Sequence, residues 1–322
     1  MKLRRALLLL SVMTAWPQTP PPAPALPGAP ASDEPQAEKP AEPSRPVLEN
    51  AGRPMQIQVT CGEDDIHALG LSCTPDEPCP IFLELSDIEP VGSKLFISGN
   101  LHTSSSTLSS VILGTEDGGK TWFEPYERIR SGVLDQIQFF DFETGWIAGQ
   151  AVRALPRDPF FLLTTDGGKT WRRKPVYDEA RVASVEHFWF DSRTNGSLIL
   201  DRRQAGEAGV AHERLETMTG GESWSLREVS SKPIKPKQGA KPPTGWRLNP
   251  HGPTKSYRIE QRRNERWTPV ASFLIEAGEC KIAERALPEP PPETAAPEPA
   301  PQPELPRIPA PKKKPTLERR TP

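Results

Sequence analysis

Two aspartates in a repeated motif are the first candidates for chemistry in this 322-residue sequence. Residues 115–122 read TEDGGKTW and residues 164–171 read TTDGGKTW, so Asp117 and Asp166 hold the same place in two copies. Glycoside hydrolases use a pair of carboxylates of this kind on either side of the scissile bond. These two occupy equivalent positions of separate repeats, however, and nothing in the pattern makes them converge on one cleft. We therefore expect both aspartates to be structural.

The motif itself predicts a tight turn between two strands. The Asp carboxylate can accept backbone N–H bonds, the glycine pair permits positive φ, and the Thr hydroxyl can bond the same turn. The closing Trp offers a large apolar surface for packing. A third copy at 217–224 carries Thr in place of Asp, and a weak fourth trace reads RNERW at 263–267. The predicted turn residues are Asp117, Gly118, Gly119, Thr121, Trp122, Asp166, Gly167, Gly168, Thr170, Trp171, Thr219, Gly220, Gly221 and Trp224.

Motifs for other chemistry are missing from the sequence. It contains no G-x-S-x-G, H-E-x-x-H, P-loop or G-x-G-x-x-G pattern, and its five histidines are scattered. A sialidase-type site needs a tyrosine nucleophile with an acidic partner, but Tyr126, Tyr177 and Tyr257 each lie in or beside an expected strand. We predict no catalytic residue, no cofactor and no metal ligand.

The four cysteines favour disulfides over metal binding, because no C-x-x-C pair is present. Four cysteines allow three connectivities. Cys61 and Cys280 lie at the two edges of the expected ordered region, whereas Cys73 and Cys79 flank a short loop that contains proline. We predict the pairs 61–280 and 73–79, which indicates an oxidising compartment.

The turns are positioned by a repeat that predicts an all-β fold. The tryptophans that close the four motifs, Trp122, Trp171, Trp224 and Trp267, are separated by 49, 53 and 43 residues, and periods of about this length are typical of propeller blades. Each period offers three apolar strand segments before the motif and one that begins at its Trp. In the second period the first three are residues 137–140, 145–149 and 160–163. We predict a β-propeller of four, or at most five, four-stranded blades.

The DGGKTW boxes resemble the Asp-box, or BNR, repeat of sialidase-type propellers. The longer pattern DFETGWIAG at 141–149, followed by a strand and TDGGKTW, is similar to the photosystem II stability/assembly factor-like family. The resemblance covers about 55–285, strongly in two repeats and weakly in two. It implies a propeller with the box between the third and fourth strands of each blade, and an exported, non-enzymatic assembly or binding role.

The two ends of the propeller are expected to meet. Residues 56–61 and 278–282 each read as a strand, and pairing the first segment with the last would protect the sheet edges. An open arrangement of blades and an edge-to-edge dimer are the alternatives. Residues 230–244 between the third and fourth periods are rich in Pro, Gly and Lys, which indicates a mobile loop or a basic docking arm.

Prolines define the predicted boundaries of the domains. Of the 40 prolines, 12 precede Met55 and 13 follow Leu287. The basic start and apolar run of residues 1–16 are typical of an export signal, with cleavage as late as residue 31. We expect disordered arms at 17–54 and 288–322 around a propeller at 55–287. The second arm ends in a basic tip that includes Lys312, Lys313 and Lys314, which could contact an anionic envelope surface.

These features favour a periplasmic or secreted scaffold that binds a protein or an envelope polymer. The formal net charge of −2 argues against a nucleic-acid partner, which usually requires a strongly basic face. No apolar run of 18 residues exists to span a membrane once the signal is removed. An extracellular glycoside hydrolase of the Asp-box group is the alternative function.

Overall fold

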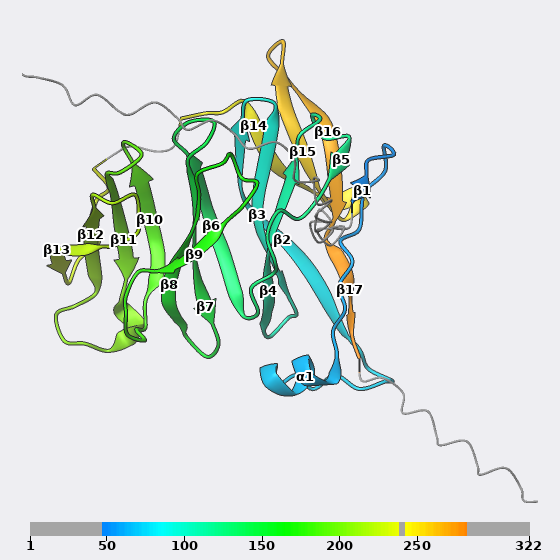
Figure 1. The fold of residues 1–322 in the computed structure, drawn as a ribbon. Coiled ribbons are helices and arrows are strands. Elements are labelled where there is room, and N and C mark those ends of the chain that lie inside the picture. The colour runs from blue at the N-terminus through cyan, green and yellow to red at the C-terminus, as the bar shows by residue number, and fades with distance from the viewer. Residues whose placement is uncertain (1–46, 238–241, 282–322) are drawn as a thin grey trace, which may run out of the picture. The chain divides into compact units, whose positions relative to one another are not determined.

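The computed structural model describes residues 47–237 and 242–281, and these form an all-β fold (Figure 1). Seventeen strands, one short α-helix and two single-turn 3-10 helices follow one another along this part of the chain. The first half contains β1 (Leu48–Glu49), α1 (Glu63–Leu69), β2 (Cys79–Val91), β3 (Lys94–His102), β4 (Thr107–Thr115), β5 (Thr121–Trp122), β6 (Gly132–Phe139), β7 (Gly145–Val152), β8 (Pro156–Thr164) and β9 (Arg172–Pro175). The second half contains β10 (Ser184–Phe190), β11 (Gly196–Asp201), β12 (His212–Thr217), β13 (Ser225–Ser230), β14 (Trp246–His251), β15 (Ser256–Arg263), β16 (Arg266–Leu274) and β17 (Glu276–Cys280).

The strands form antiparallel sheets that correspond to the sequence periods, as expected for propeller blades. Sheet one has the order β17-β2-β3-β4, sheet two β6-β7-β8-β9, and sheet three β10-β11-β12-β13. Sheet four contains only β14-β15-β16, and β5 pairs with β1 in a small sheet of its own. The middle strands, such as β7 and β8, are apolar and largely buried, because both of their faces pack against other sheets. We call β2, β6, β10 and β14, the first strand of each sheet in chain order, the leading strands.

The last strand of the described chain joins sheet one, so the two ends of the chain meet there. β17 pairs antiparallel with the start of β2, with Cys280 opposite Cys79. The structure contains both predicted disulfides, one from Cys61 to Cys280 and one from Cys73 to Cys79. Both bridges lie where β17 meets the start of β2 within sheet one.

Three hydrophobic clusters hold the sheets together in the order four, one, two, three. The first joins sheet one to sheet four through residues such as Leu83 and Phe273. The second joins sheets one and two, and the third joins sheets two and three. Among the described residues no such cluster joins sheet three to sheet four. We call each contact between neighbouring sheets a seam.

Where sheet three has no neighbouring sheet, the segment after β13 lies against it. Ile234 is buried, and the Lys237 ammonium lies 2.5 Å from the Glu216 carboxylate of β12. A mobile loop or docking arm was expected at 230–244, so the packed half of this segment is a correction. Residues 238–241 lie outside the described part of the chain.

Several elements differ from the expectations drawn from the sequence. Residues 56–61 form no strand, and only Met55 makes an isolated bridge, to Phe273. Strand β1 lies inside the stretch assigned to the first arm, and the Asn50 side chain after it donates to the Gly119 and Val270 carbonyls. Helix α1 had no predicted counterpart, although Gly62 before it and Gly70 after it are usual helix-end residues.

The fourth period also departs from the predicted four strands. In place of a box, Asn264 and Glu265 form a short hairpin turn between β15 and β16, and both have positive φ. Trp267 lies in the third strand of its sheet and begins no fourth strand. The predicted signal at 1–16, most of the first arm and the C-terminal arm with Lys312, Lys313 and Lys314 lie outside the described residues. No helix among the described residues is long and apolar enough to cross a bilayer.

Candidate functional site

The first two boxes use their aspartates inside the turn. The Asp117 carboxylate accepts hydrogen bonds from the Lys120 and Thr121 N–H groups, and from the Thr121 and Thr115 hydroxyls at 2.6 and 2.9 Å. The bonds from Thr121 lower the pKa of Asp117 well below its usual range. Asp166 accepts the equivalent bonds from Thr170 and Thr164, and its pKa is lowered although burial opposes the shift.

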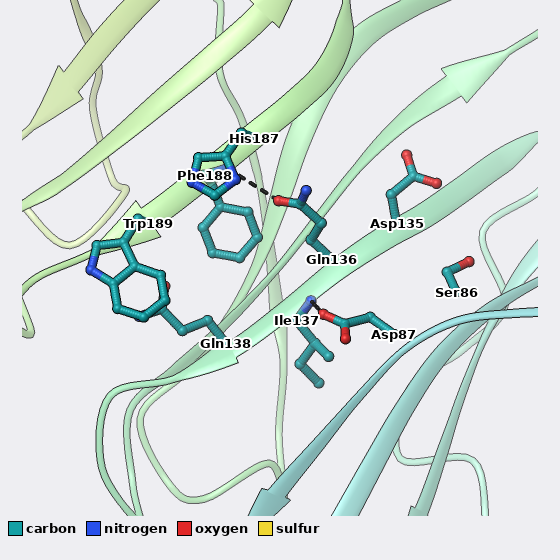
Figure 2. Close-up of a pocket in the computed structure, with 9 residues that line it drawn as sticks. All are labelled: Ser86, Asp87, Asp135, Gln136, Ile137, Gln138, His187, Phe188 and Trp189. Atoms are coloured by element: carbon teal, nitrogen blue, oxygen red, sulfur yellow. Dashed lines mark hydrogen bonds between the residues drawn. The ribbon is translucent and has the colours of Figure 1, made fainter. Parts of the chain in front are cut away.

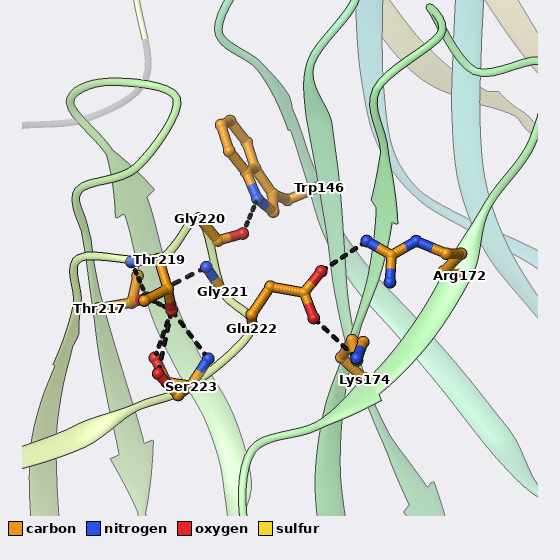
Figure 3. A network of polar contacts seen from close by, with 9 residues as sticks. All are labelled: Trp146, Arg172, Lys174, Thr217, Thr219, Gly220, Gly221, Glu222 and Ser223. Atoms are coloured by element: carbon orange, nitrogen blue, oxygen red, sulfur yellow. Dashed lines mark hydrogen bonds and ion pairs between the residues drawn. The ribbon is translucent and has the colours of Figure 1, made fainter.

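The third box replaces the charge with neutral hydrogen bonds (Figure 3). The Thr219 hydroxyl accepts from the Ser223 N–H at 3.0 Å, and Thr217 accepts from Gly221 as its counterparts do in the other boxes. Glu222 of the same turn forms ion pairs with Arg172 and Lys174 of β9. Glu222 therefore links the third turn to sheet two through ion pairs, whereas Asp117 and Asp166 accept hydrogen bonds within their own turns.

All three boxes fasten one sheet to the preceding one. A Cβ on Gly168 would lie 2.3 Å from the Phe96 ring of sheet one, and a Cβ on Gly119 would lie 2.7 Å from Val270 of sheet four. In the third box, the Trp146 indole of sheet two donates to the Gly220 carbonyl at 2.8 Å. The second glycine of the motif is thus required by close packing as well as by its positive φ.

The tryptophans that close the boxes pack at the same seams. Trp122 meets Phe273 of sheet four edge to face, with ring centroids 5.2 Å apart. Trp171 packs edge to face against Phe96, and Trp224 stacks on Phe161 at 5.1 Å. The predicted box residues therefore form fasteners, and none of them lines the cavities described next.

A groove follows the leading strands β2, β6 and β10. One cavity in it, of about 400 Å³, is lined by all three strands (Figure 2). Its lining residues are Ser86, Asp87, Asp135, Gln136, Ile137, Gln138, His187, Phe188 and Trp189. Each of the three strands carries a register shift at the same place, between Leu85 and Asp87, between Leu134 and Gln136, and between Val185 and His187. The bulges re-aim the side chains that follow them, as bulges at functional edges commonly do.

Polar side chains of sheet one cap the free N–H groups of β6. Asp87 accepts from the Ile137 N–H at 3.0 Å, and Glu89 accepts from the Phe139 N–H at 3.3 Å. Asn100 of β3 accepts from the Leu134 N–H at 2.8 Å. Strand β6 pairs only with β7 within its sheet, and these side chains of sheet one bond to N–H groups on its other edge.

Sheet two repeats this arrangement on β10. Gln136 accepts from the Phe188 N–H at 3.1 Å, and Gln150 accepts from the Val185 N–H at 3.1 Å. Gln138 both accepts from the Phe190 N–H and donates to the Phe190 carbonyl, each at 2.9 Å. The capping residues of the two sheets lie at equivalent positions of the repeat. The contacts between neighbouring sheets therefore repeat along the chain as the strands and turns do.

The capping series ends at sheet three. The equivalent positions hold His187, Trp189 and Asp201, and Asp201 is bonded instead at 2.6 Å to Arg203, which follows β11 in a short 3-10 helix. His187 Nε2 is buried but bonds to no described residue, and burial lowers the pKa of this imidazole. An indole cannot accept a hydrogen bond, so Trp189 cannot cap an amide. Because no further sheet of the described chain packs against this strand, the side chains of His187 and Trp189 line the groove instead of capping a neighbouring strand.

A second cavity continues the groove beyond Gln138 and Trp189, which line both. Its volume is about 480 Å³. Its lining residues are Glu89, Gln138, Phe139, Phe140, Trp189, Phe190, Asp191, Pro242, Pro243 and Thr244. The groove thus has a polar part around Asp135 and an aromatic part around Trp189.

Asp135 is the groove carboxyl with the most distinctive environment. Burial raises its pKa, and the nearby Glu84 carboxylate adds to the shift, while a 2.9 Å bond from Gln150 opposes it. A carboxyl in this state can act as a proton donor or can attract a cation that relieves the repulsion.

A tyrosine–glutamate pair lies apart from the groove, and sequence reasoning missed it. Tyr177 bonds to Glu213, and burial together with that bond raises the pKa of the tyrosine. Arg202, which is buried, pairs with Glu213 and Glu207 at 2.5 Å each. Tyr177 and Glu213 therefore form a tyrosine–acid pair, but neither residue lines either of the two cavities of the groove.

The sequence analysis assigned no site to the groove residues. A signal was present, because Asp87 and Gln136, Glu89 and Gln138, and Asn100 and Gln150 recur 49 or 50 residues apart. Among the described residues, no group of three or more His, Cys, Asp or Glu side chains is arranged to hold a metal ion.

Comparison with known proteins supplies no family assignment. No family model matches the chain, and no curated protein matches it. A solved structure described as YCF48 bound to D1 peptide aligns with 19% identity and a TM-score of 0.33, over 60% of this chain and 54% of that one. The chain therefore spans about half the length of that structure.

Two glycosidase structures give similar values. An α-L-arabinanase of Penicillium chrysogenum complexed with arabinobiose aligns with 14% identity and a TM-score of 0.35, over 70% of this chain and 66% of that one. The α-L-arabinofuranosidase Arb93A of Fusarium graminearum, in complex with an iminosugar inhibitor, aligns with 13% identity and a TM-score of 0.33, over 70% of each chain. These likenesses include both a peptide-bound protein and glycosidases and do not decide between them.

Proposed function

We propose that this chain is an exported, non-catalytic scaffold of the Asp-box propeller type that binds a protein or an envelope polymer in the groove along β2, β6 and β10. The end of the capping series at sheet three is the observation that carries this proposal. At that place two side chains that could cap a further strand are replaced by His187 and Trp189, which line the groove. An aromatic side chain with a neighbouring polar group is typical of a binding surface.

The hydrogen bonds of the groove support binding rather than catalysis. Asp87, Gln136 and Gln138 hold backbone groups of the neighbouring strand, so they serve the architecture. Asp117 and Asp166 lie in turns that fasten the sheets. A retaining or inverting glycosidase would need two carboxyls at a defined separation around one bond.

Export is part of the proposal. The basic and apolar segments of residues 1–16 and the two disulfides both support it, because disulfides persist in oxidising compartments. The N-terminal sequence of the protein recovered from its native host tests this directly. We expect it to begin between residues 17 and 32.

Affinity capture from the native envelope tests the scaffold role. The wild-type protein and a Trp267→Ala control should retain the same partner, and Trp189→Ala should lose it. Trp267 is a suitable control because it is a partly exposed tryptophan of sheet four outside both cavities. Equal capture by all three proteins would refute a groove-based scaffold.

Glycoside hydrolysis is the second candidate, and the raised pKa of Asp135 is the observation that favours it. A carboxyl of this kind could act as a general acid. We expect no turnover of aryl glycosides or arabinan oligosaccharides by the purified protein. Turnover that Asp135→Asn abolishes would replace the scaffold proposal with the enzyme.

A further inference from the structure

The four sheets each end in an outer strand, and these outer strands are β4, β9, β13 and β16. An unpaired strand edge presents free N–H and C=O groups and is a template for a strand of another molecule. Gly114 of β4 exchanges two backbone hydrogen bonds with Phe123, and Met55 exchanges two with β16. Strand β9 reads RRKP, and positive charge and proline at an edge discourage pairing. Three of the four outer strands are therefore protected.

The outer strand of sheet three, β13, differs from the other three. In the described part of the chain it pairs with β12 alone, and no isolated bridge reaches its other edge (Figure 1). Its sequence, SLREVS, contains neither lysine nor proline. Leu226 and Val229 are 50% and 46% exposed. An apolar edge of this kind favours association with a further strand.

A register shift brings the two apolar side chains of β13 to one face. Leu226 and Val229 lie opposite β12 residues that are two positions apart, so they point to the same side of the sheet. Arg227 is the extra residue that this bulge inserts between them. The free edge thus combines an apolar pair on one face with Arg227 and Glu228 at its centre.

The sequence of β13 is complementary to itself when two copies run antiparallel. With a two-fold axis between Arg227 and Glu228, each of these residues lies opposite the other in the second copy. In the same register Leu226 lies opposite Val229, and serine lies opposite serine at both ends. Apolar and opposite-charge pairs across strands are stabilising, whereas like charges directly opposite are destabilising. A second copy is therefore the occupant for which the strand itself supplies the matching sequence.

The two central charges also bond within their own chain. Arg227 lies 3.4 Å from Glu216, and Glu228 lies 2.8 Å from Arg214. Their side chains are nevertheless 49% and 40% exposed, and an arginine or a carboxylate can bond to more than one partner. The backbone edge and the apolar pair thus supply the attraction, and the charges select the register.

We propose that two copies of this chain pair antiparallel through β13, so that their third sheets become one continuous sheet. Such an interface uses the same strand of both copies and closes as a two-fold dimer. No residue of β13 lines either cavity of the groove, so the inference is independent of what the groove binds.

Sedimentation velocity of the full chain between about 1 and 500 µM tests the proposal, because a short edge gives a small interface and a reversible dimer. Leu226→Lys and Val229→Lys should each raise the dissociation constant by about tenfold or more, since lysine protects strand edges. Leu155→Lys is the matched control, because Leu155 is 41% exposed in the connection between β7 and β8. It should dimerise as the wild type does, and thermal melts establish that all variants are folded.

Two charge variants test the pairing itself. Arg227→Glu and Glu228→Arg each place like charges opposite one another in a dimer of identical chains, so each alone should dimerise about tenfold more weakly. An equal mixture should dimerise as the wild type does, because every pair across the axis is then of opposite charge. Hydrogen exchange of residues 225–230 should slow as the concentration rises, whereas exchange of β9 should not change.

Three results would overturn the proposal. The first is a wild-type chain that stays monomeric at every concentration up to about 1 mM. The second is a dimer that both lysine variants form as readily as the wild type, which would place the interface elsewhere. The third is a mixture of the two charge variants that dimerises no better than either variant alone.

Discussion

The seams on either side of sheet two differ from the place where sheets three and four could meet. At the first two seams, boxes pack against Phe96 and Trp146, and side chains such as Asp87 and Gln138 cap the next leading strand. Where sheets three and four could meet, other residues stand in place of both the box contacts and the capping side chains. The comparison shows that a repeat becomes a terminal unit by losing its docking residues while its own sheet stays intact.

The replacements at sheet three can be named one by one. Ser197 stands where sheets one and two have Phe96 and Trp146, and Trp189 stands where they have Glu89 and Gln138. On the facing side, the hairpin at Asn264 stands in place of a box. The face is protected instead by Ile234 and by ion pairs such as Arg214–Glu228, which give it the polar surface that a terminal repeat requires.

The junction of the chain ends gives the largest expected effect. Replacing Cys61 and Cys280 together by Ser should lower the free energy of unfolding by about 5 kcal/mol, because that bridge closes a separation of 219 residues. Replacing Cys73 and Cys79 should cost only about 2 kcal/mol, since their separation is 6. Denaturant unfolding measures both. Equal losses would mean that the stabilisation does not follow the number of residues between the bridged cysteines.

The box glycines give the next effect. Gly168→Ala forces a Cβ into the Phe96 ring at positive φ and should cost about 3 kcal/mol or more. Gly118→Ala is the matched control, because its φ is also positive but nothing lies within 4 Å of the added Cβ; it should cost about 1 kcal/mol. Urea denaturation of the two variants measures the difference. Similar losses of stability in the two variants would show that the cost comes from the positive φ alone and that packing against Phe96 adds nothing.

Removing a side chain that caps a strand at the seam of sheets two and three should lower the free energy of unfolding more than removing its counterpart on sheet three, where no further described sheet packs. Gln138→Ala leaves the N–H and C=O of Phe190 without their partner and should cost about 2 kcal/mol. Trp189→Ala at the equivalent position should cost about 1 kcal/mol or less, since that side chain is only half buried. Faster hydrogen exchange of the Phe190 amide in the first variant alone would confirm the mechanism. A larger loss for Trp189→Ala would contradict it.

Acid should weaken the hydrogen bonds within the first two boxes, whereas in the third box it should weaken only the ion pairs of Glu222 with Arg172 and Lys174. The pKa of Asp117 and of Asp166 is lower in the folded protein than the unfolded value near 4, so their contribution is present above about pH 4. It is lost as the pH falls through the lowered folded pKa. Water screens these turns, so we expect less than about 1 kcal/mol for each.

Melting temperatures between about pH 3 and pH 6 test this dependence. The double variant Asp117→Asn, Asp166→Asn should show a shallower decline on acidification than the wild type. Thr219→Asp should make the decline steeper, because it places a third carboxylate at the position that Asp117 and Asp166 hold in their turns. An identical slope in all three proteins would mean that the boxes do not set the acid response.

The strands and turns were predictable because their signals are local. Apolar runs such as 145–149 and 160–163 became β7 and β8, and the DGG motif at 117–119 became a turn with positive φ at both glycines. The missed elements lacked such signals. β1 has two residues and exists because β5 pairs with it, and the fourth sheet stops at three strands because no box turn follows β16.

The groove was not predictable in the same way, although its residues repeat at a regular spacing. Asp135 reads as an ordinary polar residue of a strand, and its unusual pKa depends on burial and on Glu84 of another sheet. Trp189 falls outside the regular placement of the tryptophans that close the boxes, but nothing in the sequence shows that it lines a groove. Only the absence of a neighbouring sheet distinguishes it.

The sequence alone determined the repeat, the turns and the choice of cysteine pairs. A turn needs particular residues at adjacent positions, and the positions of the four cysteines relative to the repeats left one pairing favoured. The tertiary structure alone decided which seams are occupied and which side chains therefore face a groove. Whether a side chain caps a strand or lines a cavity depends on what packs beside it, and that neighbour is brought there from some 50 residues away by the fold.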